Sequence, residues 1–422
     1  MITLLIVALV LLTLLGLPLF IALAGGSLLA TWNAGLDPAL LIVELNRLAS
    51  GPYLAAIPLF TFAGVVLAAG GAPERMIQLF NACVGWLPGG MAAVAIGSCA
   101  FFTAFSGASG VTILALGGLM FPMLMHAGYN ERFNLGLLTT SGSLGLLFAP
   151  SLAILLYGIV ASVSIDKMFL AGIVPGLLLM LILAVYSFYV GNKTAVPRHS
   201  FSWAALGRAL REGFWDLLLP VGIIVGIFGG FVTITEASAC TAVYVLLLEG
   251  VIHREIHLGR NLFPLMRDAA VLIGSILIIL SVAMGLTNLL IDAQVPMKIL
   301  DWMELHVDSK LQFLILLNLF LLIVGCMMDI FSAIVVVVPL ILPIAMRYGV
   351  DPVHLGIIFL AAVGRRQYSR QRGLFVYHAE DRRPYVHGKL RQLGEDRVQD
   401  LGPAKLTGEL RRGQPKLGVF GS

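Results

Sequence analysis

Long apolar runs alternate with short polar connections along the chain as far as Val363. A helix needs about 20 apolar residues to cross the hydrocarbon core of a bilayer, which is about 30 Å thick. Runs of this kind lie near residues 2–24, 53–71, 90–126, 135–160, 168–191, 214–232, 236–252, 269–290, 311–348 and 354–363. The runs at 90–126 and 311–348 are too long for one crossing and contain Gly, Ser or Asp, so we interpret each as two segments. The pattern predicts an all-α polytopic membrane protein with about 10 to 12 membrane segments.

Short amphipathic pieces separate some of these runs. Pro73–Phe80 (PERMIQLF) and Pro296–His306 (PMKILDWMELH) mix charged and apolar residues at helical spacing. Such segments suit interfacial helices that lie in the plane of the membrane. The basic connections 193–211 and 253–267 are separated by two predicted crossings, so we expect both on the cytoplasmic side.

Composition supports a membrane protein and divides the chain in two. The 422 residues are 59% apolar and 12% charged, with a mean hydropathy of +0.96, whereas soluble domains are about 45–50% apolar and about 25% charged. This balance argues against a soluble protein and against nucleic-acid binding. Residues 1–363 contain 14 Lys and Arg and 17 Asp and Glu, whereas residues 364–422 contain 13 and 6. The last part is therefore a basic, non-membrane tail.

The two halves of the membrane part resemble each other. LGGLMFPMLMHAGYNERFNLGLLTTS (116–141) matches VVVPLILPIAMRYGVDPVHLGIIFLAAV (336–363) in the spacing of Pro, Gly and the Leu-Gly-aliphatic string, and 57–80 pairs loosely with 281–302. Repeats with interrupted helices in corresponding places point to a secondary transporter built from inverted repeats. We divide the chain into a first half with scaffold helices and a first hairpin and broken-helix repeat, a polar connection, a truncated second repeat and the tail: 1–192, 193–213, 214–363 and 364–422.

The first half carries the densest cluster of Gly and Ser. FSGASGVT (105–112) is followed after one helix by LLTTSGSLGLLFAPS (137–151), in which Pro150 is expected to help break the helix. Broken helices expose backbone carbonyls, which together with hydroxyls can coordinate Na⁺, and their N-termini can face an anion. The alternative is that these small residues only allow helices to pack closely. The two clusters together favour an ion or substrate site.

Two further groups interrupt the apolar runs of the second half. Asp329 and Ser332 fall where the tip of a hairpin is expected in 311–348, and an intramembrane acid usually has a function. The alternative is that Asp329 caps the following helix. In GGFVTITEASA (229–239), Thr233, Thr235 and Glu236 fit either a helix break near a site or an N-cap with an acid in the first turn.

Signals of an enzyme are weak. His253 and His257 stand four residues apart in HREIH, but Glu255 is misplaced for a zinc motif. The four cysteines stand singly in apolar runs, so we expect neither a disulfide nor a metal site of that kind. We expect no catalytic residue and no cofactor. A polytopic membrane enzyme is the alternative of another class, and it requires a cluster of titratable side chains, whereas the predicted spans contain little beyond Asp329 and Glu236.

Three strings carry a resemblance to a known family. LLTTSGSLGLLFAPSLAILLYG, GGFVTITEASACTAVYVLL and GCMMDIFSAIVVVVPLILPIAMRYGVDPVHLGII resemble the large membrane subunit (DctM-like permease) of tripartite ATP-independent periplasmic (TRAP) transporters, over roughly residues 1–363. The resemblance implies a Na⁺-coupled, elevator-type member of the ion-transporter superfamily in the bacterial inner membrane. It implies two partners, a small four-helix membrane subunit and a periplasmic binding protein that delivers an organic acid such as a dicarboxylate or a sialic acid.

The resemblance also implies site residues. Matched by position, the sodium or substrate residues are those of the first tip, of the unwound helix beside it and of the second tip: Ser106, Gly107, Ser109, Gly110, Thr140, Ser141, Gly142, Ser143, Gly145, Asp329 and Ser332. We expect amide dipoles and hydroxyls to meet the carboxylate, because no Arg is expected deep in a span. A single-component Na⁺/dicarboxylate symporter of the same superfamily is the alternative within transport.

The chain departs from the family pattern after Val363. The family typically continues with a Gly-rich unwound segment and a last span, whereas this chain reads GRRQYSRQRGLFVYHAEDRRPYVHGKL. We hypothesise a shift of the reading frame near Val363, and the alternative is a genuine basic tail. In the first case the DNA read in another frame encodes an apolar span, and the chain as written lacks half of the second sodium site and transports poorly.

Overall fold

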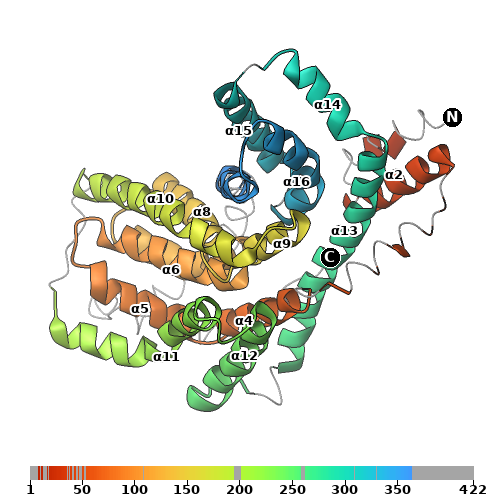
Figure 1. Ribbon diagram of the computed structural model, residues 1–422. Coiled ribbons are helices and arrows are strands. Elements are labelled where there is room, and N and C mark those ends of the chain that lie inside the picture. Colours follow the sequence, from red (N-terminus) through yellow and green to blue (C-terminus); the bar gives the residue numbers. More distant parts are fainter. Residues whose placement is uncertain are drawn as a thin grey trace. The chain divides into compact units, whose positions relative to one another are not determined.

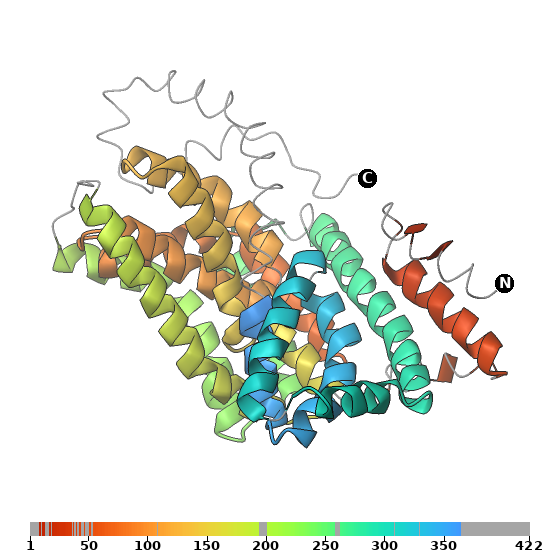
Figure 2. The ribbon, with the colours of Figure 1, turned by 90° about the horizontal axis from the view of Figure 1, so that it is seen from above.

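The computed structural model describes residues 54–107, 109–193, 201–257, 262–307, 309–328 and 330–363, together with 19–35 and scattered positions before 54. All secondary structure in these ranges is helical, without a strand (Figures 1 and 2). The prediction of an all-α protein is confirmed. The predicted tail at 364–422 lies outside the described residues.

The elements follow one another as α-helices with two short irregular turns. They are α2 (Leu19–Ala34), α4 (Ala56–Ala69), α5 (Ala72–Val84), α6 (Gly90–Ser106), α7 (Ser109–His126), α8 (Glu131–Leu144), the 3₁₀ turn η1 (Gly145–Leu147), α9 (Leu152–Val160), α10 (Ile165–Lys193), α11 (Trp203–Phe228), α12 (Ile234–Leu247), the π turn η2 (Leu248–Ile252), α13 (Leu262–Asp292), α14 (Val295–Glu304), α15 (Lys310–Met327) and α16 (Ile330–Arg347). A last apolar helix spans Pro352–Val363.

Several of these helices are long and apolar enough to cross a membrane. Within the described ranges there are 4 such helices, or up to 6 if each of two bent pairs is one span. Shorter apolar helices of 10–17 residues accompany them, among them Gly90–Ser106 and Lys310–Gly325. Because α6 and α7 divide the run at 90–126, and α15 and α16 divide that at 311–348, the expected interruption of both long runs is confirmed.

The chain forms two compact units. Unit 1 contains residues up to 58, 153–171 and 270–363, and unit 2 contains 59–152 and 172–269. In unit 2, α6 packs against α5, α7 and α8, and α5 also packs against α11 (Figure 1). Alanine and glycine make up much of α6, which lets neighbouring helices approach closely.

In unit 1, α15 and α16 form a closed hairpin. The rings of Phe313 and Tyr348 stack with centroids 4.7 Å apart, which brings the start of α15 to the end of α16. Lys310 Nζ donates to the carbonyl of Gly349 at 2.6 Å at the same end. Tyr157 anchors the helix Pro352–Val363 in this unit by donating to the Pro352 carbonyl at 2.7 Å.

The order of the elements agrees with the proposed repeat. In the first set, helix α4 is followed after a break by the short helix α5 and then by the hairpin α6 and α7. In the second set, α13 is followed by the short helix α14 and then by the hairpin α15 and α16. The angle between α4 and α5 is 74°. The inverted orientation of the halves and the division of the chain at 192 and 213 stay predictions.

Candidate functional site

The first predicted tip lies where α6 ends. Gly107 follows the last residue of α6, has a φ of +63°, and donates its N–H to the Thr103 carbonyl at 2.8 Å. This left-handed conformation closes a helix and suits glycine, which has no Cβ. A methyl group on Gly107 would lie 2.5 Å from Leu152 Cβ, so the tip is in close contact with the start of α9. Ser109 and Gly110 lie in the first turn of α7.

The helix beside the tip is broken at residues 145–151. Thr140, Ser141, Gly142 and Ser143, which were expected in an unwound segment, lie instead in the last turns of the regular helix α8. The α-helix α8 ends at Leu144, η1 covers Gly145–Leu147, and α9 begins at Leu152, so Pro150 lies between two helices. A methyl group on Gly145 would lie 2.5 Å from Thr103 Cβ, which is closer than real side chains approach. Within unit 2, the end of α6 is therefore beside Gly145, where α8 ends, and the tip is beside Leu152, where α9 begins.

Most predicted hydroxyls are hydrogen-bonded locally. Thr140, Ser141 and Ser143 donate to carbonyls of α8 that lie three or four residues earlier, at 2.7–3.0 Å. The Ser106 and Thr112 hydroxyls are 2.9 Å apart. A hydroxyl that donates its hydrogen keeps lone pairs on its oxygen, so these groups remain suitable as ligands of a cation. Gly142 is buried in the same helix.

Two hydroxyls that sequence reasoning did not select lie in the same junction. Thr103 and Ser151 are fully buried, and neither Oγ1 of Thr103 nor Oγ of Ser151 has a hydrogen-bond partner among the described residues. Thr103 borders Gly145, and Ser151 directly precedes Leu152, which contacts the tip. Buried polar groups normally have a partner, and oxygen atoms are the ligands of hard cations. Both oxygens are therefore chemically suited to a hard cation such as sodium, and a sodium site here stays a prediction.

The second predicted tip lies between α15 and α16. The first helix ends at Met327 and the second begins at Ile330, so the expected break is present. Ser332 is fully buried in the first turn of α16. Asp329 lies outside the described residues. This tip belongs to unit 1, and its role stays a prediction.

The third cluster starts a helix. Thr233 is the N-cap of α12 and accepts from the Glu236 N–H at 3.3 Å, while Glu236 Oε2 accepts from the Thr233 N–H at 2.7 Å. This reciprocal pattern is a capping box. Thr235 lies in the first turn of α12. The structural alternative for these residues is thus the observed one.

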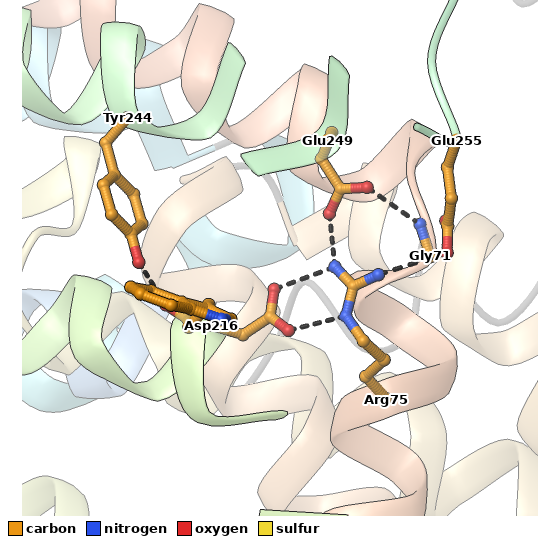
Figure 3. Close-up of polar contacts among 7 residues, drawn as sticks. Gly71, Arg75, Asp216, Tyr244, Glu249 and Glu255 are labelled. Carbon is orange, nitrogen blue, oxygen red and sulfur yellow. Dashed lines mark hydrogen bonds and ion pairs between the residues drawn. The ribbon is translucent and has the colours of Figure 1, made fainter. Parts of the chain in front are cut away.

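A buried ion cluster in unit 2 was not expected from the sequence (Figure 3). Arg75 donates from Nε and Nη2 to the two oxygens of Asp216 at 2.6 and 3.0 Å, and from Nη2 also to Glu249. Its Nη1 donates to Glu255 at 3.2 Å. The side chains of Asp216 and Glu249 are 0% exposed, that of Arg75 is 9% exposed and that of Glu255 is 36% exposed.

This cluster corrects one expectation. The predicted spans 214–232 and 236–252 contain the acids Asp216 and Glu249 in addition to Glu236, and both are buried in the cluster. Arg75 lies in the amphipathic segment Pro73–Phe80, outside the predicted spans. This segment is helical as expected, within α5, and α5 packs against α6 and α11; its position in the plane of the membrane stays a prediction. The signal that was available is the presence of one acid in the run 214–232 and two in the run 236–252.

The electrostatics of the cluster favour a structural role. Burial lowers the pKa of His253, and the nearby guanidinium lowers that pKa further, so this imidazole adds no positive charge at neutral pH. Arg75 faces three carboxylates, which accept four hydrogen bonds from its guanidinium. No group of three or more His, Cys, Asp or Glu side chains suited to a metal occurs in the described part of the chain.

Sequence comparison identifies relatives of the chain. The profile of the family described as "Tripartite ATP-independent periplasmic transporter, DctM component" matches residues 6–365. The chain is 36% identical over 324 residues to the C4-dicarboxylate TRAP transporter large permease protein DctM of Pseudomonas aeruginosa, which covers 76% of this chain and 75% of that protein. It is 30% identical over 384 residues to the ectoine/5-hydroxyectoine TRAP transporter large permease protein UehC of Ruegeria pomeroyi, with 89% of each chain covered.

A further relative is longer than this chain. The isethionate TRAP transporter permease protein DctMQ of Oleidesulfovibrio alaskensis is 35% identical over 349 residues, which are 82% of this chain and 55% of that protein. The chain therefore spans about half the length of this relative. The match to the family profile ends at residue 365, close to Val363, where the sequence pattern changes.

Proposed function

Because the chain belongs to the DctM family of tripartite ATP-independent periplasmic transporter components, a family of large permease subunits, we propose that it imports a small organic acid in a sodium-coupled manner. The observation that carries the proposal is the junction in unit 2 between the first tip and the broken helix. Two interrupted helices meet there, and the buried hydroxyl oxygens of Thr103 and Ser151 have no described partner. Junctions of this kind hold coupling ions in secondary transporters.

Coupling follows from a difference in affinity. Sodium held by carbonyl and hydroxyl oxygens fixes the tip against the broken helix, and the organised tip then presents its amide groups to the anion. The anion consequently binds more tightly when sodium is bound, and by linkage sodium binds more tightly when the anion is bound. Arg75 does not serve as the anion ligand in this scheme, since three carboxylates already surround it.

The substrate class rests on the relatives. Their names include C4-dicarboxylate, ectoine and isethionate, and isethionate is a sulfonate. A carboxylate such as a C4-dicarboxylate is the first substrate to test. We further propose that the chain works in the bacterial inner membrane with a small membrane subunit and a periplasmic binding protein.

Sodium binding to the purified full-length chain tests the proposal without requiring transport. A ligand that binds the folded state raises its free energy of unfolding by about 2.7 kcal/mol at 100 times its Kd. We expect Na⁺ to raise the Tm more than K⁺ at equal ionic strength. Thr103→Val removes the hydroxyl oxygen, and we expect it to weaken sodium affinity at least about tenfold, which is about 1.4 kcal/mol.

The matched control is Thr241→Val. Thr241 is also a buried threonine of unit 2, but it lies on α12, which contributes neither to the tip nor to the broken helix, so we expect its loss to leave the sodium affinity unchanged. Equal stabilisation by Na⁺ and K⁺, or an unchanged sodium affinity in Thr103→Val, contradicts the proposal.

A single-component symporter is the alternative. Uptake into vesicles with and without a periplasmic binding protein separates the two, because only the tripartite system requires that protein. The similarity to proteins named as TRAP permeases favours the tripartite system.

A further inference from the structure

The buried ion cluster holds together three segments of unit 2. Arg75 lies on α5, Asp216 on α11, and Glu249 in the π turn η2, with Glu255 just after it (Figure 3). Asp216 engages one edge of the guanidinium with both oxygens, which fixes the plane of the group as well as its position. The cluster thus determines where the beginning of α5 lies against α11 and η2.

The cluster also holds the elbow between α4 and α5. The two helices meet at 74°, and Gly70 and Gly71 lie between them. The Gly71 N–H donates to Glu249 Oε2 at 3.3 Å, so the carboxylate that pairs with Arg75 binds the elbow as well. A methyl group on Gly70 would collide with the Glu249 carboxylate, and one on Gly71 with that of Glu255. The glycines therefore allow the acids to approach the backbone of the elbow.

The other side of this elbow touches the first hairpin tip. Gly64 lies on α4, six residues before Gly70, and its backbone faces the end of α6. A methyl group on Gly64 would lie 2.6 Å from the Phe105 carbonyl oxygen and 2.8 Å from Ser106 Cα. A rotation of the elbow that moves α4 toward α6 therefore displaces Phe105 and Ser106.

We propose that Arg75 is a positioning residue for the first hairpin tip, which it holds in place through the elbow at Gly70–Gly71 and the contact at Gly64. The arginine itself does not contact Phe105 or Ser106 in this scheme. The three carboxylates hold Arg75, and with it the start of α5, in one position. The position of α5 sets the angle of the elbow to α4. The backbone of α4 at Gly64 then packs against the end of α6 and keeps the tip in place. The inference rests on the proposed function only in that the tip is taken as part of the sodium site.

Thiol labelling measures the position of the tip directly. In full-length protein whose four native cysteines are replaced, Ser106→Cys places a reporter at a side chain that is 4% exposed. Labelling of a buried thiol requires local opening, and its rate rises with the population of the open state. We expect Arg75→Met to raise the labelling rate at this position at least about tenfold, measured without sodium. Arg75→Lys keeps the charge but not the fork, so its rate should lie between those of Arg75→Met and the parent.

Thr287→Cys is the control for general loosening. Thr287 is also buried, at 5% exposure, but it belongs to α13 in unit 1. An unchanged rate at Ser106→Cys in Arg75→Met overturns the proposal, and so does an equal rise at Ser106→Cys and Thr287→Cys. Should Arg75→Met fail to fold, Arg75→Lys and Glu255→Gln supply the same comparison, because both leave part of the cluster in place.

Sodium separates this inference from the proposed function. If Arg75 positions the tip of a sodium site, Arg75→Lys weakens sodium affinity in the Tm measurement, whereas a variant of equal stability elsewhere does not. The sodium measurement uses protein that retains Ser106. If Na⁺ and K⁺ stabilise that protein equally while Arg75→Met raises labelling at Ser106→Cys, the positioning role stands and the sodium site is removed. A weakened sodium affinity without a change in labelling removes the positioning role and keeps the sodium site.

Discussion

The short helices α5 and α14 occupy equivalent places in the order of elements, but the basic residue of α5 is buried and that of α14 is exposed. Each follows a break after a longer helix, begins with Pro at its first or second position, and carries a basic residue two positions after that Pro: Arg75 in α5 and Lys298 in α14. Arg75 is buried among three carboxylates. Lys298 is exposed and donates to the Ala293 carbonyl at 3.3 Å, and no ion pair between described residues includes it.

The difference shows what the repeat contributes and what was added to it. The carboxylates around Arg75 come from residues 201–257, the segment of α11, α12 and η2 that lies between the two matching sets of helices. The proposed repeat covers the helix, its Pro and its cation, whereas the acids that bury the cation come from the helices between the two sets. The second copy has instead an exposed pair between Glu304 of α14 and Arg347 of α16, at 3.2 Å.

Removing the two cations should give the largest contrast. Arg75→Met leaves two fully buried carboxylates without their cation, and breaking a buried pair in this way lowers the free energy of unfolding by about 3–5 kcal/mol. Lys298→Met changes an exposed side chain, so the expected change is within about 0.5 kcal/mol. Thermal unfolding in detergent measures both, and a similar effect of the two variants contradicts the comparison.

Removing single acids sharpens the contrast within the cluster. Asp216→Asn removes a buried, two-point partner of Arg75, and hydrogen bonds to charged groups contribute about 1.5–3 kcal/mol each. Glu255→Gln changes a partly exposed acid, for which ion pairs contribute under about 1 kcal/mol. The expected order of destabilisation is therefore Asp216→Asn above Glu255→Gln. The reverse order indicates that Glu255, not Asp216, anchors the arginine.

Replacing a glycine with alanine in α4 and in α13, the helices that precede α5 and α14, tests how closely each of them is packed at that position. On α4, Gly64→Ala forces a Cβ against the backbone of Phe105 and Ser106, and overpacking of this kind costs about 1–3 kcal/mol. On α13, Gly274→Ala meets nothing within 4 Å, and replacing a helical glycine with alanine stabilises by about 0.5–1 kcal/mol. The two variants should thus shift the Tm in opposite directions, and a shift of the same sign contradicts the close contact at Gly64.

The sequence predicts those features whose signal is local. The break at Gly107 and the one around Pro150 are visible because glycine and proline disrupt an apolar helix wherever it packs. The capping box at Thr233 and Glu236 is visible because its partners are three residues apart. The family strings in turn predict the membership that the profile match confirms.

The features that the sequence does not predict depend on packing between distant segments. Arg75 pairs with acids 141, 174 and 180 residues away, and its own segment, PERMIQLF, has the charge pattern of a surface helix. Thr103 and Ser151 are ordinary polar residues in the sequence, and what marks them is their burial without a described partner together with their place beside Gly145 and Leu152. Asp329 and the tail at 364–422 lie outside the described residues, so the hypotheses on both stay predictions.

The exposed pair of the second copy should give the smallest effect. The side chains of Arg347 and Glu304 are 68% and 47% exposed, and exposed ion pairs contribute about 0–1 kcal/mol. We expect Arg347→Met to lower the free energy of unfolding by less than about 1 kcal/mol, and the difference to vanish at about 1 M salt, where the Debye length is about 3 Å. The loss caused by Arg75→Met should persist at the same salt concentration, because water and ions do not reach a buried pair. If salt reduced the loss in free energy of unfolding equally in both variants, solvent would have to enter the Arg75 cluster. The two ion pairs would then differ only in how far they are buried.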